Sequence, residues 1–240
     1  FRVVDERTAL ELRTEARDRI LADAHTARGS DLAEAMDLLA GLVNEDKFDQ
    51  LLRDLDGARE RFTALLGRLG GVDGLAAEAA RTLGIETATT PDAVLAATVT
   101  DDALAASDLR RLARAWTQGA KTNQDGARIL DAWLDGSAER RAAGYVEIFA
   151  PLFLTQKNEP KAEKTIISKG AREADPDALD IAQAAQRTIV GVLGRLGAVQ
   201  VVAATAALAR IGAAMLDAYD GLKQRRAVLD YEDLISRARG

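Results

Sequence analysis

The sequence contains no cysteine and a single histidine, His25, and aromatic side chains make up only 4% of its 240 residues. Without cysteine the chain has no disulfides, no thiolate metal ligands and no cysteine nucleophile. One histidine argues against a conventional zinc site and against a histidine-based catalytic triad. His25 falls near the end of the first predicted helix, a typical position for a solvated residue that favours the helix dipole.

Proline and the strand-forming residues are also scarce, whereas Ala, Leu, Arg, Glu and Asp dominate the composition. These dominant residues include strong helix formers, so the composition predicts an all-α fold. A chain of this length can bury a substantial core as one large domain or two small ones. We therefore predict a multi-helix bundle, organised around a long C-terminal helix.

The net charge is −6, which makes the surface as a whole a poor attractor of nucleic acid unless the basic residues are segregated. The chain starts at Phe1 and shows no signal peptide or basic targeting segment. We expect a cytoplasmic piece of a larger protein.

The long C-terminal helix is predicted to begin at Asp175-Pro176-Asp177, where an aspartate cap precedes a proline suited to the first helical turn. No further proline appears before about Arg226, which allows roughly 50 helical residues. Gly191, Gly194 and Gly197 each weaken a helix interior. The segment is therefore either one bent helix or two helices.

The middle of this helix, residues 196–209, is apolar on every face except at Gln200 and Thr205, so we expect other helices to surround it. A membrane span is the rival interpretation. Arg195 and Arg210 bracket only about 14 residues, whereas a span needs roughly 20. We therefore expect no membrane association.

Earlier in the chain, apolar periodicity predicts a single helix over about 45–69, with Arg53, Asp54, Arg59, Glu60 and Arg61 on its solvent face. Side-chain caps are predicted at three other helix starts, namely Asp5, Ser30 and Ser137. An extended piece is expected at Phe153-Leu154-Thr155.

Two groups of basic residues are candidates for binding nucleic acid. Residues 156–174 form a basic window with the breakers Pro160 and Gly170, and it contains Lys157, Lys161, Lys164, Lys169 and Arg172. This basic window is the best linker candidate, and it is either a contact for a phosphate backbone or a mobile, solvated loop. Arg110, Arg111 and Arg114 form the second group, which either holds phosphates or is a solvated helix face.

No catalytic constellation is found. Val3-Val4-Asp5-Glu6 imitates the end of a Walker B strand, but a capped helix start explains it. Gly119-Ala120-Lys121-Thr122 imitates the tail of a P-loop, but it lacks the upstream glycine and the preceding strand. Carboxylate pairs such as Asp177 with Asp180 lie beside helix starts, where capping accounts for them.

The C-terminal residues carry a resemblance. A long helix that ends in Tyr219-x-x-x-Lys223 is followed by L-D-Y-x-D-L-I at 229–235, the chain opens with Phe1-Arg2-Val3-Val4-Asp5-Glu6, and Phe153-Leu154-Thr155 precedes the basic window. In this order these segments resemble the accessory domain called 1B of UvrD/RecB-type DNA helicases. Within that group the chain is most similar to the AddA-type helicase-nuclease subunit of the AddAB double-strand-break repair complex.

The resemblance implies that residues 1–228 are a helical 1B-like domain and that residues 229–240 start the return into a motor domain. The Walker motifs of such helicases lie outside this stretch, so ATP and Mg²⁺ would belong to the parent protein and no cofactor to this piece. Leu229, Asp230, Tyr231, Asp233 and Leu234 would be structural anchors, with Tyr231 and Leu234 packed into the motor. The family often has a glycine where this chain has Arg226-Ala227-Val228.

The implied function is to position duplex DNA through sugar and phosphate contacts, without ATPase or nuclease activity in this piece. The implied partners are double-stranded DNA and an AddB-like subunit reached through the parent protein. The alternative is a helical scaffold that docks a partner protein in an apolar groove beside the long helix. A self-sufficient enzyme is the third and least favoured interpretation.

Overall fold

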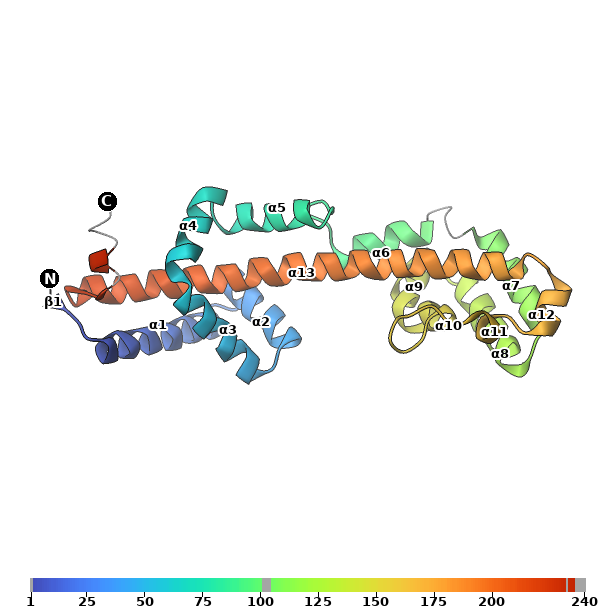
Figure 1. Cartoon of the computed structure of the whole chain (residues 1–240), viewed down its shortest axis with the longest axis horizontal. Coiled ribbons are helices and arrows are strands. Elements are labelled where there is room, and N and C mark those ends of the chain that lie inside the picture. The colour runs from blue at the N-terminus through green and yellow to red at the C-terminus, as the bar shows by residue number, and fades with distance from the viewer. Residues whose placement is uncertain (1, 101–104, 232, 236–240) are drawn as a thin grey trace. The chain divides into compact units, whose positions relative to one another are not determined.

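The computed structural model describes residues 2–100, 105–231 and 233–235, and it confirms the all-α prediction (Figure 1). The sequence also predicts a helix start at Thr100-Asp101-Asp102, and Asp101 and Asp102 lie outside these residues. The described chain divides into two compact units. Unit 1 comprises the described residues up to Thr87 and those from Val201 onward, and unit 2 comprises Ala88–Gln200.

Unit 1 contains a short parallel strand pair and a set of helices. Its elements are β1 (Arg2–Val3), α1 (Glu6–Thr26), α2 (Asp31–Leu42), α3 (Glu45–Gly57), α4 (Arg59–Leu69), α5 (Val72–Thr82) and β2 (Val228–Leu229). The C-terminal part of the long helix α13 (Ala178–Arg225) completes this unit.

Unit 2 is built from short helices and the N-terminal part of α13. Its other elements are α6 (Pro91–Thr100), α7 (Ala106–Thr117), α8 (Lys121–Leu134), α9 (Ala138–Ala143), the π-helix η2 (Tyr145–Phe149), α10 (Ala150–Phe153), α11 (Glu163–Ile166) and α12 (Lys169–Ala174). Leu154 makes an isolated antiparallel bridge to Pro160, so only one residue of the expected extended piece pairs as a strand.

The three predicted helix caps are confirmed. Asp5 accepts a hydrogen bond from the Thr8 N–H at 2.8 Å, and Ser30 accepts one from the Ala33 N–H at 3.2 Å. Ser137 accepts one from the Arg140 N–H at 3.4 Å. A short polar side chain before a helical run is thus a reliable start signal in this chain.

The prediction of one helix over 45–69 is wrong, because the chain breaks into α3 and α4 at Ala58. Gly57 ends α3, and glycine is the weakest helix former apart from proline. The break also turns Arg59 away from solvent: its side chain is only 11% exposed. Its predicted place on the solvent face is therefore wrong as well.

The long C-terminal helix is a single element, α13, which runs through Gly191, Gly194 and Gly197 without a break (orange to red in Figure 1). It is the one described helix that is long and apolar enough to cross a membrane. Only 22% of its most apolar 18-residue window is buried, so the prediction that other helices surround this segment is wrong. Val192, Val199 and Val202 are buried, whereas Val190 and Val201 are 41% and 53% exposed.

Unit 2 has an aromatic core. Phe149 stacks on Trp133 with ring centroids 4.1 Å apart, and it also contacts Tyr145 and Phe153 at 5.3 and 5.1 Å. Trp116 contacts Phe153 at 5.7 Å. All five rings are buried. The π-helix η2 presents Tyr145 and Phe149 to this core while Val146, Glu147 and Ile148 stay exposed.

The core of unit 1 is largely aliphatic. Leu12 and Ala16 of α1 pack with Tyr219 and Leu222 of α13, and Val4 and Val228 beside the strands belong to the same cluster. A second cluster joins α1, α2, α3 and α13 through Ile20, Leu39, Leu52, Ile211 and Met215. Leu12, Ala16 and Ile20, which recur at four-residue spacing on α1, therefore face α13.

Candidate functional site

A buried carboxylate, Asp230, is the centre of a polar cluster in unit 1. The Tyr219 hydroxyl donates a hydrogen bond to Asp230 Oδ2 at 2.7 Å, and Arg59 Nη2 donates one to the same oxygen at 2.8 Å. The Asp230 side chain is only 4% exposed. These contacts join α4, α13 and the segment after β2, although Arg59 and Asp230 are 171 residues apart in the sequence.

Lys223 and Asp233 extend this arrangement, and we call Arg59, Tyr219, Lys223, Asp230 and Asp233 the Asp230 cluster. The Lys223 ammonium lies 2.7 Å from Asp233 Oδ1 and 3.5 Å from Asp230 Oδ2. The Asp230 N–H donates to Asp233 Oδ2 and the Asp233 N–H donates to Asp230 Oδ1, each at 2.9 Å. This reciprocal pair is a capping box, which starts the helical turn that follows β2.

The charges of the Asp230 cluster stabilise one another. Burial would raise the pKa of Asp230, but hydrogen bonds from Tyr219, the Asp233 N–H and Arg59 hold that pKa far below its ordinary range. Burial would lower the pKa of Lys223, but the carboxylates of Asp233 and Asp220 raise it overall. Burial and the Asp230 carboxylate raise the pKa of Tyr219. Asp230 and Lys223 are therefore both charged at neutral pH and lie beside opposite charges, while Tyr219 stays neutral, which suits a fixed anchor rather than an acid–base catalyst.

The Asp230 cluster lies at the end of a parallel strand pair. β1 and β2 pair in the register Arg2 with Val228 and Val3 with Leu229, and the Val4 N–H donates to the Leu229 carbonyl at 2.9 Å. Both residues of β1 are exposed, Val3 by 50%. Tyr231 is 72% exposed and Leu234 is 37% exposed.

Several of the predicted nucleic-acid contacts are already occupied by carboxylates. Arg111 binds Asp175 at 2.5 Å and Asp177 at 2.7 Å, and Arg110 binds Asp135 at 2.6 Å. These hydrogen bonds raise the pKa of both guanidinium groups. The arginines thus join the ends of helices within unit 2, and neither presents a free guanidinium to a phosphate.

The prediction that 156–174 is a linker is wrong, because this basic window folds against α7 and α8. Ile166 and Ile167 are buried. The Asn123 side chain fixes the segment by donating to the Ile166 carbonyl at 2.9 Å and accepting from the Ser168 N–H at 3.0 Å. Pro160 and Gly170 do not keep the segment extended or solvated, since apolar side chains between them reach the core.

Three of the cations in the basic window have partners inside unit 2. Lys161 donates to the Pro151 carbonyl at 2.6 Å and the Leu152 carbonyl at 3.3 Å, and burial lowers its pKa. Arg172 pairs with Glu163, and Lys169 lies 3.7 Å from Glu173. In the part of the chain that the structure describes, the exposed Lys157, Lys164 and Arg114 make no ion pair.

Sequence reasoning missed Arg59 and Asn123 as fixed polar contacts. No sequence pattern around Asn123 indicates a buried hydrogen bond. Arg59 falls at a position that an unbroken helix over 45–69 would expose to solvent. A buried arginine can be predicted only when its acidic partner is known. Here that partner is Asp230, which lies 171 residues later in the sequence. Only the glycine at position 57 signalled that the helix ends two residues before Arg59.

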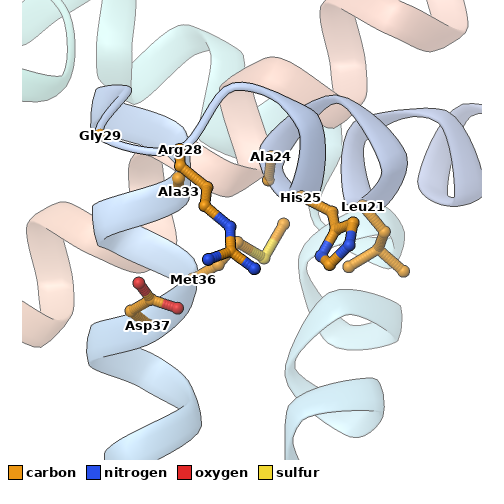
Figure 2. Close-up of a pocket in the computed structure, with 8 residues that line it drawn as sticks. All are labelled: Leu21, Ala24, His25, Arg28, Gly29, Ala33, Met36 and Asp37. Atoms are coloured by element: carbon orange, nitrogen blue, oxygen red, sulfur yellow. The ribbon is translucent and has the colours of Figure 1, made fainter.

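A separate hollow of about 510 Å³ lies between α1 and α2 in unit 1 (Figure 2). Leu21, Ala24 and Met36 line it together with His25, Arg28 and Asp37. In Figure 2 the polar side chains come from opposite walls, His25 from α1 and Asp37 from α2. Across residues 2–100, 105–231 and 233–235, no three His, Asp or Glu side chains are placed to hold a metal ion.

Comparisons with protein-family models, with curated proteins and with solved structures find no match for this chain.

Proposed function

We propose that this chain is the non-catalytic accessory arm of an ATP-dependent DNA helicase-nuclease of the UvrD/RecB type, most similar to AddA, acting on double-strand breaks in the cytoplasm. ATP and Mg²⁺ would bind in the motor of the parent protein, which would also carry the contacts to an AddB-like subunit. The observation that carries the proposal is the parallel pairing of β1 with β2, fixed by the buried Asp230 cluster.

A parallel pair of two-residue strands is unusual as an isolated element. Two-stranded sheets are marginally stable alone, and parallel sheets are normally covered on both faces by other structure. Here Val3, Tyr231 and Leu234 are exposed beside the pair. An accessory arm that continues into the parallel sheet of a motor domain would cover these side chains and extend the sheet.

The DNA-positioning part of the proposal depends on those predicted DNA contacts that make no ion pair among the described residues, namely Lys157, Lys164 and Arg114. Contacts from three cations to phosphates would give weak, sequence-independent binding that salt weakens steeply. Between 50 and 200 mM salt, three such contacts predict a loss of affinity of about 40-fold. The net charge of −6 keeps the rest of the surface from adding to this binding.

Retardation of a fluorescent DNA duplex by the chain at low salt tests this function. Replacing Lys157, Lys164 and Arg114 together by glutamine should abolish the retardation. A matched variant in which Lys47, Arg61 and Arg68 of unit 1 become glutamine removes the same charge and should retain it. No retardation by the unmodified chain at about 20 mM salt would refute the DNA-binding role.

A second candidate function is a helical scaffold that docks a partner protein. The exposed apolar side chains of α13, such as Val190 and Val201, favour it, because contiguous exposed apolar surface often marks a protein interface. Sedimentation of the chain with an AddB-like subunit would separate the two functions, since docking by apolar contacts should persist at salt that removes DNA.

A further inference from the structure

Unit 2 contains a groove of about 730 Å³ that the Asp230 cluster does not line and that shares Lys164 with the proposed DNA contacts. It lies between α8, the π-helix η2, α10 and the α11 segment, with Trp116 of α7 at its floor. Buried Gly126 and Ile166 complete the floor. A Cβ added to Gly126 would come within 3.2 Å of the Trp116 ring, so the glycine allows α8 to lie directly on that ring.

The walls of the groove carry aliphatic side chains that face solvent. Ile129 of α8 is 44% exposed and Ile148 of η2 is 49% exposed. Pro151 is exposed and Leu152 is half-buried beside them. The π-helical turns, such as the Phe149 N–H to the Gly144 carbonyl at 3.1 Å, help to place Ile148 outside the core while Tyr145 and Phe149 remain inside it. Such π segments occur frequently at functional sites.

The rim of the groove has one cation and one anion available for a ligand. Lys164 and Glu147 are exposed, and neither makes an ion pair with another described residue. The remaining charges are used internally: Asp125 pairs with Arg128, and the Lys161 ammonium donates to two carbonyls of α10. These two unpaired residues lie on different walls of the groove: Lys164 belongs to α11 and Glu147 belongs to η2.

We propose that this groove holds an amphipathic helix of a partner protein, with its aliphatic stripe against Ile129 and Ile148 and a carboxylate beside the stripe facing Lys164. Helices that dock in grooves between helices present anchors at positions i, i+3 or i+4 and i+7. A nucleic acid strand fits less well, because Glu147 repels phosphates and Trp116, 2% exposed, offers no face for base stacking. The inference extends the second candidate function by naming the chemistry of the partner.

The probe is a fluorescein-labelled synthetic peptide of about 16 residues, cross-linked into a helix, with leucines at i, i+3 and i+7 and glutamates beside the stripe. Its fluorescence anisotropy is followed while the whole 240-residue chain is titrated. Binding is expected below about 100 μM. Ile129→Ser and Ile148→Ser should each weaken it by at least about tenfold, because both remove a central apolar contact.

Lys164→Glu should weaken binding about fivefold, and a peptide with lysines in place of the glutamates should recover that loss on the same variant. Leu83→Ser, at an aliphatic side chain of similar exposure in unit 1, should change the affinity by less than about twofold. Circular dichroism of each variant establishes that it is folded.

Three outcomes would overturn the proposal. These are no binding at about 1 mM peptide, binding that Leu83→Ser weakens and the isoleucine variants do not, or self-association of the chain that Ile129→Ser abolishes, which would assign the groove to a second copy. Retardation of duplex DNA is measured on the same isoleucine variants and should be unchanged. Peptide binding therefore tests the groove, and DNA retardation tests the DNA-binding function, so one proposal can be refuted while the other stands.

Discussion

The two units each bury a tyrosine, and the two tyrosines differ in what surrounds the hydroxyl. Tyr145 in unit 2 packs against the rings of Trp133 and Phe149, and its hydroxyl has no hydrogen-bond partner among the described residues. Tyr219 in unit 1 donates to the ionised Asp230 and has the cations Arg59 and Lys223 over its ring at 5.4 and 4.8 Å. Unit 2 is thus organised by ring packing, and the end of unit 1 by paired charges.

The difference indicates where each unit tolerates change. An aromatic core loses packing when a ring is removed, whereas a buried charge cluster loses most when one partner leaves the others unpaired. The stability that an aromatic core contributes is insensitive to pH over most of the range. The stability that a buried charge cluster contributes depends on the ionisation of its carboxylates.

The largest effect is expected from Phe149→Ala, which removes a fully buried ring stacked on Trp133. The free energy of unfolding of unit 2 should fall by about 3–5 kcal/mol. Urea denaturation followed by tryptophan fluorescence reports it, because both tryptophans, Trp116 and Trp133, belong to this unit. Val146→Ala in the same π-helix, where the side chain is exposed, should cost less than about 0.5 kcal/mol; equal losses in the two variants would contradict an aromatic core.

The matching test of unit 1 is Asp230→Asn, which removes the negative charge between Arg59 and Lys223. Unfolding free energy measured by far-ultraviolet circular dichroism in urea should fall by about 2–3 kcal/mol, because two buried cations lose a partner. Asp217→Asn on the exposed face of α13 is the control and should change stability by less than about 0.5 kcal/mol. If the two asparagine variants were equally stable, the cluster would not anchor the strand pair.

The pH dependence of unit 1 separates it from unit 2. Because the pKa of folded Asp230 lies below the unfolded value of about 3.9, the stability it contributes is complete above that value. It declines as the pH falls below about 4 and is lost once the pH passes the folded pKa. The difference in melting temperature between the unmodified chain and Asp230→Asn should therefore shrink below about pH 4. A difference that stayed constant down to pH 2 would mean that the carboxylate has no depressed pKa.

Removing the two tyrosine hydroxyls should have effects of opposite sign. Tyr219→Phe deletes a hydrogen bond to a charged carboxylate and should lower the stability of unit 1 by about 1.5–2 kcal/mol. Tyr145→Phe deletes a buried hydroxyl without a protein partner and should raise the stability of unit 2 by about 1 kcal/mol. Both variants are measured in the same urea titration, and each is the control for the other. If both changed the free energy of unfolding in the same direction, the proposed difference between the two hydroxyl environments would be wrong.

The smallest effect concerns two left-handed residues, Asn158 in unit 2 with φ 59° and Ala227 in unit 1 with φ 52°. Asparagine adopts this conformation readily, but alanine does so at a cost of about 1–2 kcal/mol. Ala227→Gly should therefore stabilise unit 1 by about 0.5 kcal/mol, after allowing for the greater freedom of glycine in the unfolded chain. Ala22→Gly, on the exposed face of α1, should instead destabilise it by about 1 kcal/mol, as differential scanning calorimetry would show.

Ala227 also shows how the tertiary structure can override a local preference. Its left-handed backbone is a conformation in which a glycine would be favoured. The chain turns here from α13 into β2, with the Ala227 carbonyl accepting from the Arg2 N–H at 3.1 Å. The strand pairing thus fixes a conformation that the local sequence disfavours.

Local signals determined much of this protein. Helix-forming composition set the all-α class, caps at Asp5, Ser30 and Ser137 set helix starts, and the absence of proline between Pro176 and about Arg226 allowed a long helical segment there. Each of these depends on hydrogen bonds or dihedral preferences within a few residues, so the sequence alone is sufficient to predict it.

Tertiary structure decided what the charged residues do. Arg59, Arg110, Arg111 and Lys161 look like solvated or phosphate-binding cations in the sequence, yet each is held by an acceptor from another element. The exposure of α13 and the groove beside Ile129 and Ile148 also depend on which faces the neighbouring helices cover. The free energy of a charge or an apolar side chain depends on its partners in space, and those partners lie far away in the sequence.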